Sequence, residues 1–311
     1  MIVKIKNLTK TYKSGVRALN NLSFEVREGE IFGLLGPNGS GKTTCINCML
    51  ALLKFEEGTI DVFDQKMTST NYAVKQNIGV ITQNVAVFDE LTVYENIDYF
   101  CGLYIKDKTL RKQYVEEAIE FVSLEDFRKF YPKKLSGGLL RRLHIACGIA
   151  HHPKLILLDE PTVAVDPQSR NKILEGIKKL NEQGATIIYT SHYMEEVEQL
   201  CDYIIILDKG QIVAEGTKED LKSSIDLGET IEIELKNPTD DILNDILALP
   251  NVTKAYYKES LLIVKSGKGK TNIPPVLKVL ASHKCEYDRI YSELPTLNDV
   301  FLEITGKELR D

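Results

Sequence analysis

Short apolar runs, separated by polar and glycine-rich segments, make up most of the first 220 residues. Runs of about four to eight apolar residues bounded by turn residues are typical of strands. The pattern predicts an opening β-rich layer from strands at 2–8 and 22–27, with Thr9 to Asn20 as the turn between them. Further strands are predicted at 30–35, 58–63, 78–82, 155–158, 186–189, 203–207 and 211–215.

Helical spacing of apolar residues separates several of these strands. It is found at 44–50, 92–103, 109–124 and 140–150. Thr92 and Glu95 form a capping-box signature, which favours a helix beginning at Thr92. The segments between 92 and 124 therefore predict a helical insertion between two parts of one sheet.

After residue 222 the pattern changes to a second, smaller arrangement. Strand and helix patterns follow in the order β-α-β-β-α-β, which is the order of a ferredoxin-like unit. A short amphipathic helix is predicted at 297–306. We therefore expect an α/β domain over 1–222, with a helical subdomain at about 90–150, and a small α+β domain over 223–311.

Composition and charge narrow the class of protein. Of 311 residues, 43% are apolar and 27% charged, as in soluble globular proteins. The net charge of −6 argues against a dedicated nucleic-acid binder, so no nucleic-acid partner is predicted. No apolar run approaches the ~18 residues of a membrane span, and the first residues lack the apolar core of a signal peptide. We expect the chain to stay in the cytoplasm, with any membrane part supplied by another polypeptide.

The cysteines are spread along the chain and do not form a convincing chemical motif. Cys45-x-x-Cys48 matches a redox or zinc half-motif, but it has no second pair and has apolar neighbours. Packing in the core is the favoured interpretation, with free thiols throughout.

The segment 36–43 fits the phosphate-binding pattern G-x-x-x-x-G-K-[ST] without a mismatch. A predicted strand precedes it and a predicted helix follows it, so the helix N-terminus faces the phosphate. Lys42 is expected to reach the β- and γ-phosphates, and the Thr43 hydroxyl to bind magnesium. A glycine-rich surface turn is the alternative. The predicted nucleotide-binding residues are Gly36, Pro37, Asn38, Gly39, Ser40, Gly41, Lys42, Thr43 and Thr44.

Two acids end the apolar strand at 155–158. Ligands bind at the carboxyl ends of strands in open parallel sheets, which makes Asp159 a magnesium anchor and Glu160 a candidate base for an attacking water. Gln83, at the end of the strand at 78–82, is placed to complete magnesium coordination or to orient water. His192 follows the strand at 186–189 and is expected at the same edge. A solvated acid pair, an ordinary loop amide and a structural histidine are the alternatives.

Two further segments have two interpretations each. Ser136, Gly137 and Gly138 precede a predicted helix, which suits either a second anion site or a simple N-cap with a hinge. Tyr12, in the polar turn before the P-loop, can stack on a nucleotide base or be a half-buried packing residue.

Together these motifs resemble the ATP-binding subunit of ABC transporters over roughly residues 2–220. The motifs, in family order, are the P-loop at 36–43, the glutamine loop at Gln83, the LSGG signature at 135–138, ILLDEP at 156–161, a D-loop at 164–166 and a switch histidine at His192. The resemblance implies a P-loop NTPase with a RecA-like core, an N-terminal antiparallel β layer and a helical signature subdomain. It also implies adenine stacking by Tyr12.

The resemblance further implies a head-to-tail dimer that hydrolyses ATP with Mg²⁺. ATP would lie between the P-loop of one subunit and Ser136, Gly137 and Gly138 of the other. Glu160 would be the general base, His192 would contact the γ-phosphate, and Asp166 would lie at the dimer interface. Leu139 stands where the family usually has Gln, which removes a polar contact but leaves the residues that address phosphate. The D-loop reads Ala-Val-Asp where Gly-Leu-Asp is commoner, and keeps the acid.

The C-terminal segment resembles the daunorubicin-resistance type of these ATPases, which are paired with ABC-2 permeases. This implies export of an amphipathic compound through a separate multi-span permease, on the inner face of the membrane, as a homodimer or heterodimer. The C-terminal domain would regulate or contact the dimer. A soluble ABC ATPase of ribosomes or DNA is the alternative, although one cassette and no sustained heptads do not favour it. A small GTPase or nucleotide kinase leaves the LSGG stretch unexplained.

Overall fold

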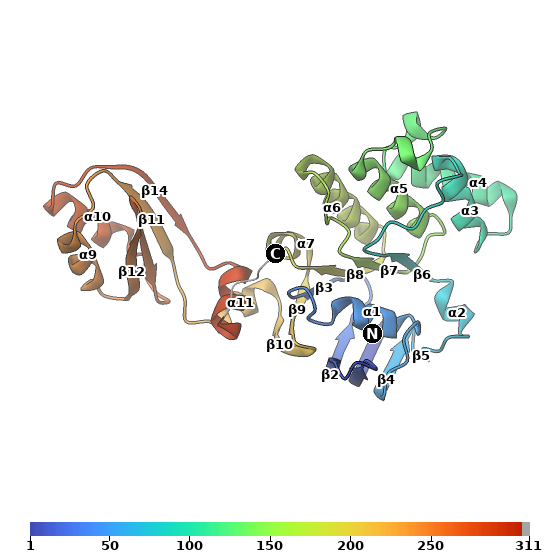
Figure 1. The fold of residues 1–311 in the computed structure, drawn as a ribbon, viewed down its shortest axis with the longest axis horizontal. Coiled ribbons are helices and arrows are strands. Elements are labelled where there is room, and N and C mark those ends of the chain that lie inside the picture. The colour runs from blue at the N-terminus through green and yellow to red at the C-terminus, as the bar shows by residue number, and fades with distance from the viewer. Residues whose placement is uncertain (307–311) are drawn as a thin grey trace. The chain divides into compact units, whose positions relative to one another are not determined.

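The structure is a computed structural model that describes residues 1–306 of the chain. The chain divides into two compact units, the first over Met1–Lys218 and the second beginning at Glu219 (Figure 1). No helix among residues 1–306 is long and apolar enough to cross a membrane.

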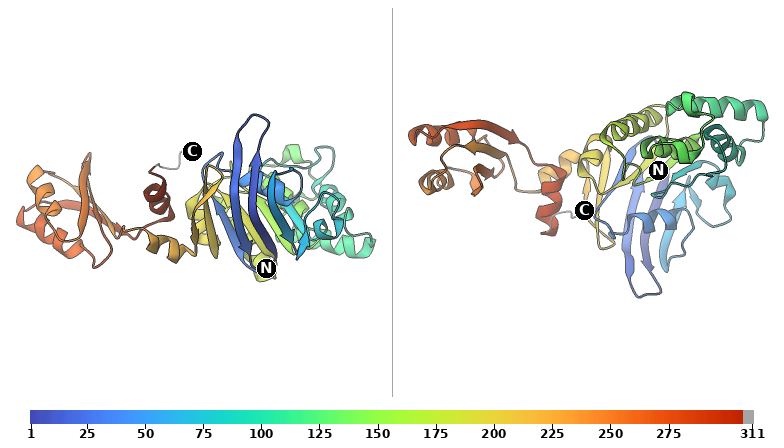
Figure 2. Two further views of the ribbon diagram at one scale, coloured as in Figure 1. Left: turned by 90° about the horizontal axis from the view of Figure 1, so that it is seen from below. Right: turned by 45° about the horizontal axis from the view of Figure 1, so that its top comes forward.

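The first unit opens with an antiparallel sheet in the order β2-β1-β4-β5. Its strands are β1 (Val3–Thr11), β2 (Arg17–Val26), β4 (Glu57–Val62) and β5 (Gln65–Lys66). Figure 2 shows this layer in blue against the second sheet. Buried residues of both sheets form one hydrophobic cluster, in which the Phe24 and Phe32 rings stack with centroids 5.2 Å apart. The turn between β1 and β2 is shorter than predicted, because both strands continue toward it.

The second sheet carries the order β10-β9-β3-β8-β7-β6. It contains β3 (Ile31–Leu35), β6 (Ile78–Ile81), β7 (Leu155–Asp159), β8 (Thr186–Ser191), β9 (Tyr203–Asp208) and β10 (Gln211–Gly216). β3, β7 and β8 are buried at every position, which explains their continuous apolar runs. These strands are parallel, so their carboxyl ends meet at one edge, where Leu35 pairs with Ser191 and Asp159 with Thr190.

Helices α6 (Pro167–Glu182) and α7 (Met194–Leu200) connect strands of this sheet, whereas α1 (Lys42–Met49) leads from β3 to β4 of the first sheet. The sequence pattern did not predict α6 and α7, nor the short α2 (Tyr72–Lys75) and α8 (Lys218–Ser224). In α6 only Ile173, Leu174 and Ile177 are buried, so its sequence is mostly polar. Its start is nevertheless signalled by Asp166 as N-cap and Pro167 in the first turn.

The predicted helical insertion lies between β6 and β7. It holds α3 (Val93–Gly102), α4 (Lys108–Phe121) and α5 (Gly137–Ile149), drawn in green in Figure 1, with two short 3₁₀ turns between α4 and α5. The capping box at α3 is confirmed, because Thr92 Oγ1 accepts from the Glu95 amide and Glu95 accepts from the Thr92 amide.

The second unit contains an antiparallel sheet in the order β12-β13-β11-β14. Its elements are β11 (Thr230–Leu235), α9 (Asp240–Leu247), β12 (Val252–Lys258), β13 (Leu261–Ser266), α10 (Ile273–Ser282), β14 (Tyr287–Glu293) and α11 (Leu297–Thr305). Apolar residues of the strands and of α9 and α10 form a separate core. From β11 to β14 the elements follow the β-α-β-β-α-β order predicted for a ferredoxin-like unit.

All six cysteines are free, and five are buried. Burial raises the pKa of the Cys48 thiol to about 11 and that of Cys45 well above its usual range. Cys45 and Cys48 belong to the core shared by the two sheets, so the packing interpretation is confirmed.

Candidate active site

The loop between β3 and α1 is shaped by close backbone approaches. A side chain at Gly36 would place its Cβ 2.3 Å from the Leu207 carbonyl oxygen, and one at Gly41 would lie 2.6 Å from that of Ala18. Gly41 also has φ of 111°, which favours glycine, and it is the N-cap of α1. These contacts hold the loop where its exposed amides and the α1 N-terminus can receive an anion.

Lys42 joins this loop to the acids at the end of β7. Its Nζ donates to the carbonyl oxygens of Gly36 at 2.7 Å and Pro37 at 3.2 Å. It also lies 3.1 Å from Glu160 Oε1, and both side chains are 4–5% exposed. Burial lowers the pKa of Lys42, while the Glu160 carboxylate opposes that shift.

Asp159 and Glu160 are held by the neighbouring strand β8. The Glu160 amide donates to the Thr190 hydroxyl at 3.0 Å, and that hydroxyl donates to Asp159 Oδ1 at 2.7 Å. Glu160 has φ of 49°, a left-handed conformation that is uncommon for a residue with a side chain. The adjacent acids therefore are not a solvated pair: each is 4% exposed.

The Glu160 carboxylate is the meeting point of the predicted residues. Gln83 Nε2 donates to its Oε2 at 3.4 Å, and His192 Nδ1 lies 3.3 Å from the same oxygen. Lys42 contacts the other oxygen. Residues from three separate segments thus converge on one buried carboxylate, with His192 half-buried beside it.

Tyr12 lies at the first turn of α1. Its hydroxyl is 3.0 Å from Thr44 Oγ1, and the side chain is 38% exposed. The side chain is therefore near the P-loop and partly exposed, with Lys10 Nζ 5.8 Å from the centre of its ring. Thr43 is exposed at the same helix turn.

The signature residues form a second group together with the D-loop. Ser136 is the N-cap of α5, where its Oγ accepts from the Leu139 amide at 3.3 Å. A Cβ on Gly138 would lie 2.3 Å from Ser169 Oγ and 3.1 Å from Asp166 Oδ2. Asp166 caps α6 by accepting from the Ser169 amide at 2.9 Å.

Ser136 and Gly137 are exposed to solvent. Within residues 1–306, no hydrogen bond or ion pair joins the signature group to the Gly36–Thr43 loop. Ser136 is thus the N-cap of α5, and its anion-binding role stays a prediction.

Arg141 was missed by the sequence reasoning. The side chain is 3% exposed, and its guanidinium donates to four carbonyl oxygens at 2.6–2.9 Å. These belong to Thr82, Gln83, Glu160 and Pro161. Arg141 thereby joins the glutamine loop to the acid-bearing turn. The sequence signal was an arginine on the otherwise apolar, buried face of α5.

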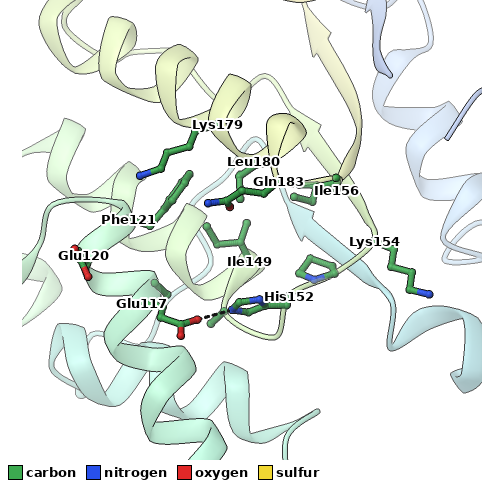
Figure 3. A pocket seen from close by; sticks show the side chains of 15 residues that line it. Glu117, Glu120, Phe121, Ile149, His152, Lys154, Ile156, Lys179, Leu180 and Gln183 are labelled. Carbon is green, nitrogen blue, oxygen red and sulfur yellow. Dashed lines mark ion pairs between the residues drawn. The ribbon is translucent and has the colours of Figure 1, made fainter. Parts of the chain in front are cut away.

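A separate cavity lies away from this site (Figure 3). It has a volume of about 450 Å³ and lies between α4, α6 and the segment before β7. Glu117 and His152, 3.1 Å apart, face one another in it. The cavity is also lined by Lys154 and Ala185, which come directly before β7 and β8. Glu160 and His192, in contrast, come directly after these two strands. Because the strands are parallel, this cavity lies at the opposite edge of the sheet from the converging site.

The three residues predicted to bind a divalent cation all carry oxygen donors. The Asp159 carboxylate, the Thr43 hydroxyl and the Gln83 amide oxygen are the kind of ligands that Mg²⁺ prefers, alongside substrate phosphates. Among residues 1–306 no group of three or more His, Cys, Asp or Glu could hold a metal ion. The donor set thus fits a magnesium ion shared with phosphates rather than an all-protein metal cage.

These features define a P-loop ATPase. They are a phosphate-binding loop, a buried strand that ends in two acidic residues, and a parallel sheet that carries an antiparallel layer and a helical insertion. Residues 19–163 match the family described as ABC transporter. The chain is 36% identical over its whole length to the linearmycin resistance ATP-binding protein LnrL of Bacillus subtilis, all of which is covered. The chain belongs to the ATP-binding subunits of ABC transporters, and is thus an ATP-hydrolysing, energy-coupling subunit.

Two further comparisons agree with this. The daunorubicin resistance ATP-binding protein DrrA3 of Streptomyces coeruleorubidus is 31% identical over 94% of this chain and 93% of its own. The dimeric post-hydrolysis structure of the ATP-binding cassette MJ0796, bound to ADP and Pi, has a TM-score of 0.64 and 32% identity. It covers 69% of this chain and 98% of that one.

Proposed function

We propose that this subunit drives export of an amphipathic compound, such as a drug, an antibiotic or a lipid-like molecule, through a separate ABC-2 type permease. The observation that carries the proposal is similarity to two resistance proteins over nearly the whole chain, including the ferredoxin-like unit. The chain would thus sit on the inner face of the membrane by binding the permease.

Within the site, the geometry supports a division of roles. Lys42 and the amides of 36–43 bind the β- and γ-phosphates, while Tyr12 stacks on adenine. Thr43, Gln83 and Asp159 hold Mg²⁺, which neutralises charge on the phosphates when bound. Glu160 accepts a proton from the attacking water, and His192 contacts the γ-phosphate. The convergence of Lys42, Gln83 and His192 on the Glu160 carboxylate supports these assignments.

The signature acts in a dimer. Ser136, Gly137 and Gly138 present a hydroxyl, exposed amides and the α5 N-terminus, but they belong to a group without bonds to their own P-loop. We infer that they close the nucleotide site of a second ABC ATPase subunit, with Asp166 at the interface. The second subunit is either another copy or a related chain.

Contact with the permease is assigned to the surface after Gln83. Phe88 and Tyr99 are exposed and pack edge to face, 5.0 Å between ring centroids. Asn96 ties this segment to α3, accepting from the Phe88 amide at 2.8 Å and donating to the Phe88 carbonyl at 3.0 Å. A partner that moves this surface would move Gln83 relative to Glu160, which links transport to hydrolysis.

Glu160→Gln tests the chemistry. The amide keeps the size of the side chain but cannot take a proton, so ATP binding should persist while turnover is lost and an ATP-bound dimer accumulates. Glu229→Gln, which changes an acid in the second unit, is the matched control and should hydrolyse ATP normally. Near-normal hydrolysis by Glu160→Gln would contradict its role as base.

Co-purification tests the partner and the function class. From detergent extracts, the tagged chain should co-purify with a multi-span membrane protein. Deletion of the gene for this chain should sensitise the host to an amphipathic compound. Co-purification with ribosomes or DNA instead would favour a soluble ABC ATPase.

A further inference from the structure

The carboxylate of Glu196 in α7 is buried, and none of the roles above uses it. The side chain is 3% exposed, and its Oε2 accepts three hydroxyl hydrogen bonds. The donors are Thr162 Oγ1 at 2.8 Å, Tyr189 Oη at 2.7 Å and Ser191 Oγ at 3.0 Å. Thr162 lies two residues after Glu160, Tyr189 lies within β8, and Ser191 comes directly before His192.

Two of these bonds anchor the carboxylate to the core. Thr162 and Tyr189 are both fully buried. Burial, aided by the Glu196 charge, raises the pKa of Tyr189 well above its usual range, so its hydroxyl keeps its proton and donates at neutral pH. Arg170 Nε, 3.3 Å from Glu196 Oε1, offsets the buried negative charge.

The third bond reaches the loop of His192. Ser191 Oγ donates to Glu196 and also accepts from the Tyr193 amide at 2.9 Å. The residues on both sides of His192 are therefore tied to one fixed carboxylate. Arg170 adds to this, because its guanidinium lies 4.7 Å from the centre of the Tyr193 ring.

We propose that Glu196 is a positioning residue for ATP hydrolysis, whose anchored carboxylate fixes His192 through Ser191. The proposal rests on the proposed contact of His192 with the γ-phosphate. Glu196 itself contacts none of Lys42, Asp159 or Glu160 by a hydrogen bond among the described residues, so it acts through the loop and not on the substrate.

A positioning role differs measurably from a purely structural one. If Glu196 and Ser191 act through the same bond, their substitutions will not add, because removing either end removes the same restraint. If Glu196 only stabilises the fold, its loss will lower the melting temperature and add to any effect of Ser191 on turnover.

The test measures steady-state ATP hydrolysis by the full-length chain in Glu196→Gln, Ser191→Ala and the double variant. Loss of a charge-assisted hydrogen bond to the loop should lower kcat about tenfold in each single variant. The KM for ATP should stay within about twofold, since the phosphate loop is unchanged. The double variant should be no slower than the slower single variant.

Glu196→Asp is the conservative variant, and it should recover part of the kcat lost in Glu196→Gln because it keeps the charge. Additive losses, a raised KM with normal kcat, or normal kcat in Ser191→Ala would each overturn the proposal. Ser191→Ala keeps the buried carboxylate and two of its donors, so it remains informative if Glu196→Gln fails to fold. A fully active His192→Ala would instead remove the role of His192 on which the inference rests.

Discussion

Arg141 offers the sharpest test of how the site is held together. In Arg141→Lys, one ammonium replaces a planar guanidinium whose donors reach the carbonyls of Thr82, Gln83, Glu160 and Pro161. A lysine side chain cannot reach both loops at once, so about two of these buried or partly buried carbonyls lose their partner. At about 1–3 kcal/mol for each unpaired group, the variant should lose roughly 2–6 kcal/mol of stability.

For a unit of this size, about 2–4 °C of melting temperature accompanies each kcal/mol, so thermal unfolding should shift down by roughly 5–20 °C. ATP turnover should fall as well, because Gln83 and Glu160 lose their common tie. Arg142→Lys is the matched control. Among residues 1–306, its guanidinium donates hydrogen bonds to the carbonyls of Val122 and Ser123, at 2.8 and 3.3 Å, and these residues lie far along the chain from both loops. An Arg141→Lys protein with the melting temperature and kcat of Arg142→Lys would refute the reasoning.

Three other predictions concern separate parts of the first unit. Gly138→Ala should lower ATP turnover with little change in ATP affinity, and it should reduce the free energy of unfolding by about 1–3 kcal/mol, because the new Cβ would meet Ser169. Adding Ser169→Gly to the same chain should restore part of the turnover in ATPase assays and part of the stability in thermal melts. Tyr12→Ala should raise the KM for ATP by about tenfold through lost stacking, whereas Tyr12→Phe, which keeps the ring, should not. Equal KM values for the two variants would contradict the stacking role of Tyr12. Burial lowers the pKa of His144 and His151 to about 4, so the unfolded chain binds these protons first as the pH falls. The free energy of unfolding should therefore fall between pH 6.5 and 4, by about 1.4 kcal/mol per pH unit for each histidine. Urea titrations of His151→Phe should show a weaker dependence of the free energy of unfolding on pH, and an unchanged dependence would contradict the assignment.

Local motifs made much of the fold predictable. The Gly36–Thr43 loop, the apolar strand before Asp159 and the capping box at Thr92 each depend on neighbours in the sequence. The ferredoxin-like order was also predictable, because each strand and helix of the second unit has its own periodicity.

Contacts between distant segments escaped the sequence reasoning. The contact partners of Arg141 and Glu196 could not be read from the sequence, because only the fold brings these side chains against carbonyls and hydroxyls of distant segments. Thr190 was not singled out in the sequence, although its hydroxyl contacts both acid residues. Helix α6 was missed because tertiary packing of three buried residues outweighs a polar sequence.

The central claim is that each ATP is hydrolysed between the P-loop of one subunit and the signature of another. Lys42→Ala and Ser136→Arg should each abolish turnover in the purified full-length chain, because every site of a homodimer then has one defective wall.

An equimolar mixture of the two variants tests this claim most directly. Random pairing puts about half of the chains in mixed dimers, in which one of the two sites combines an intact Lys42 with an intact Ser136. The mixture should regain up to about a quarter of wild-type turnover. If the mixture is no more active than the two variants measured separately, the composite site is contradicted.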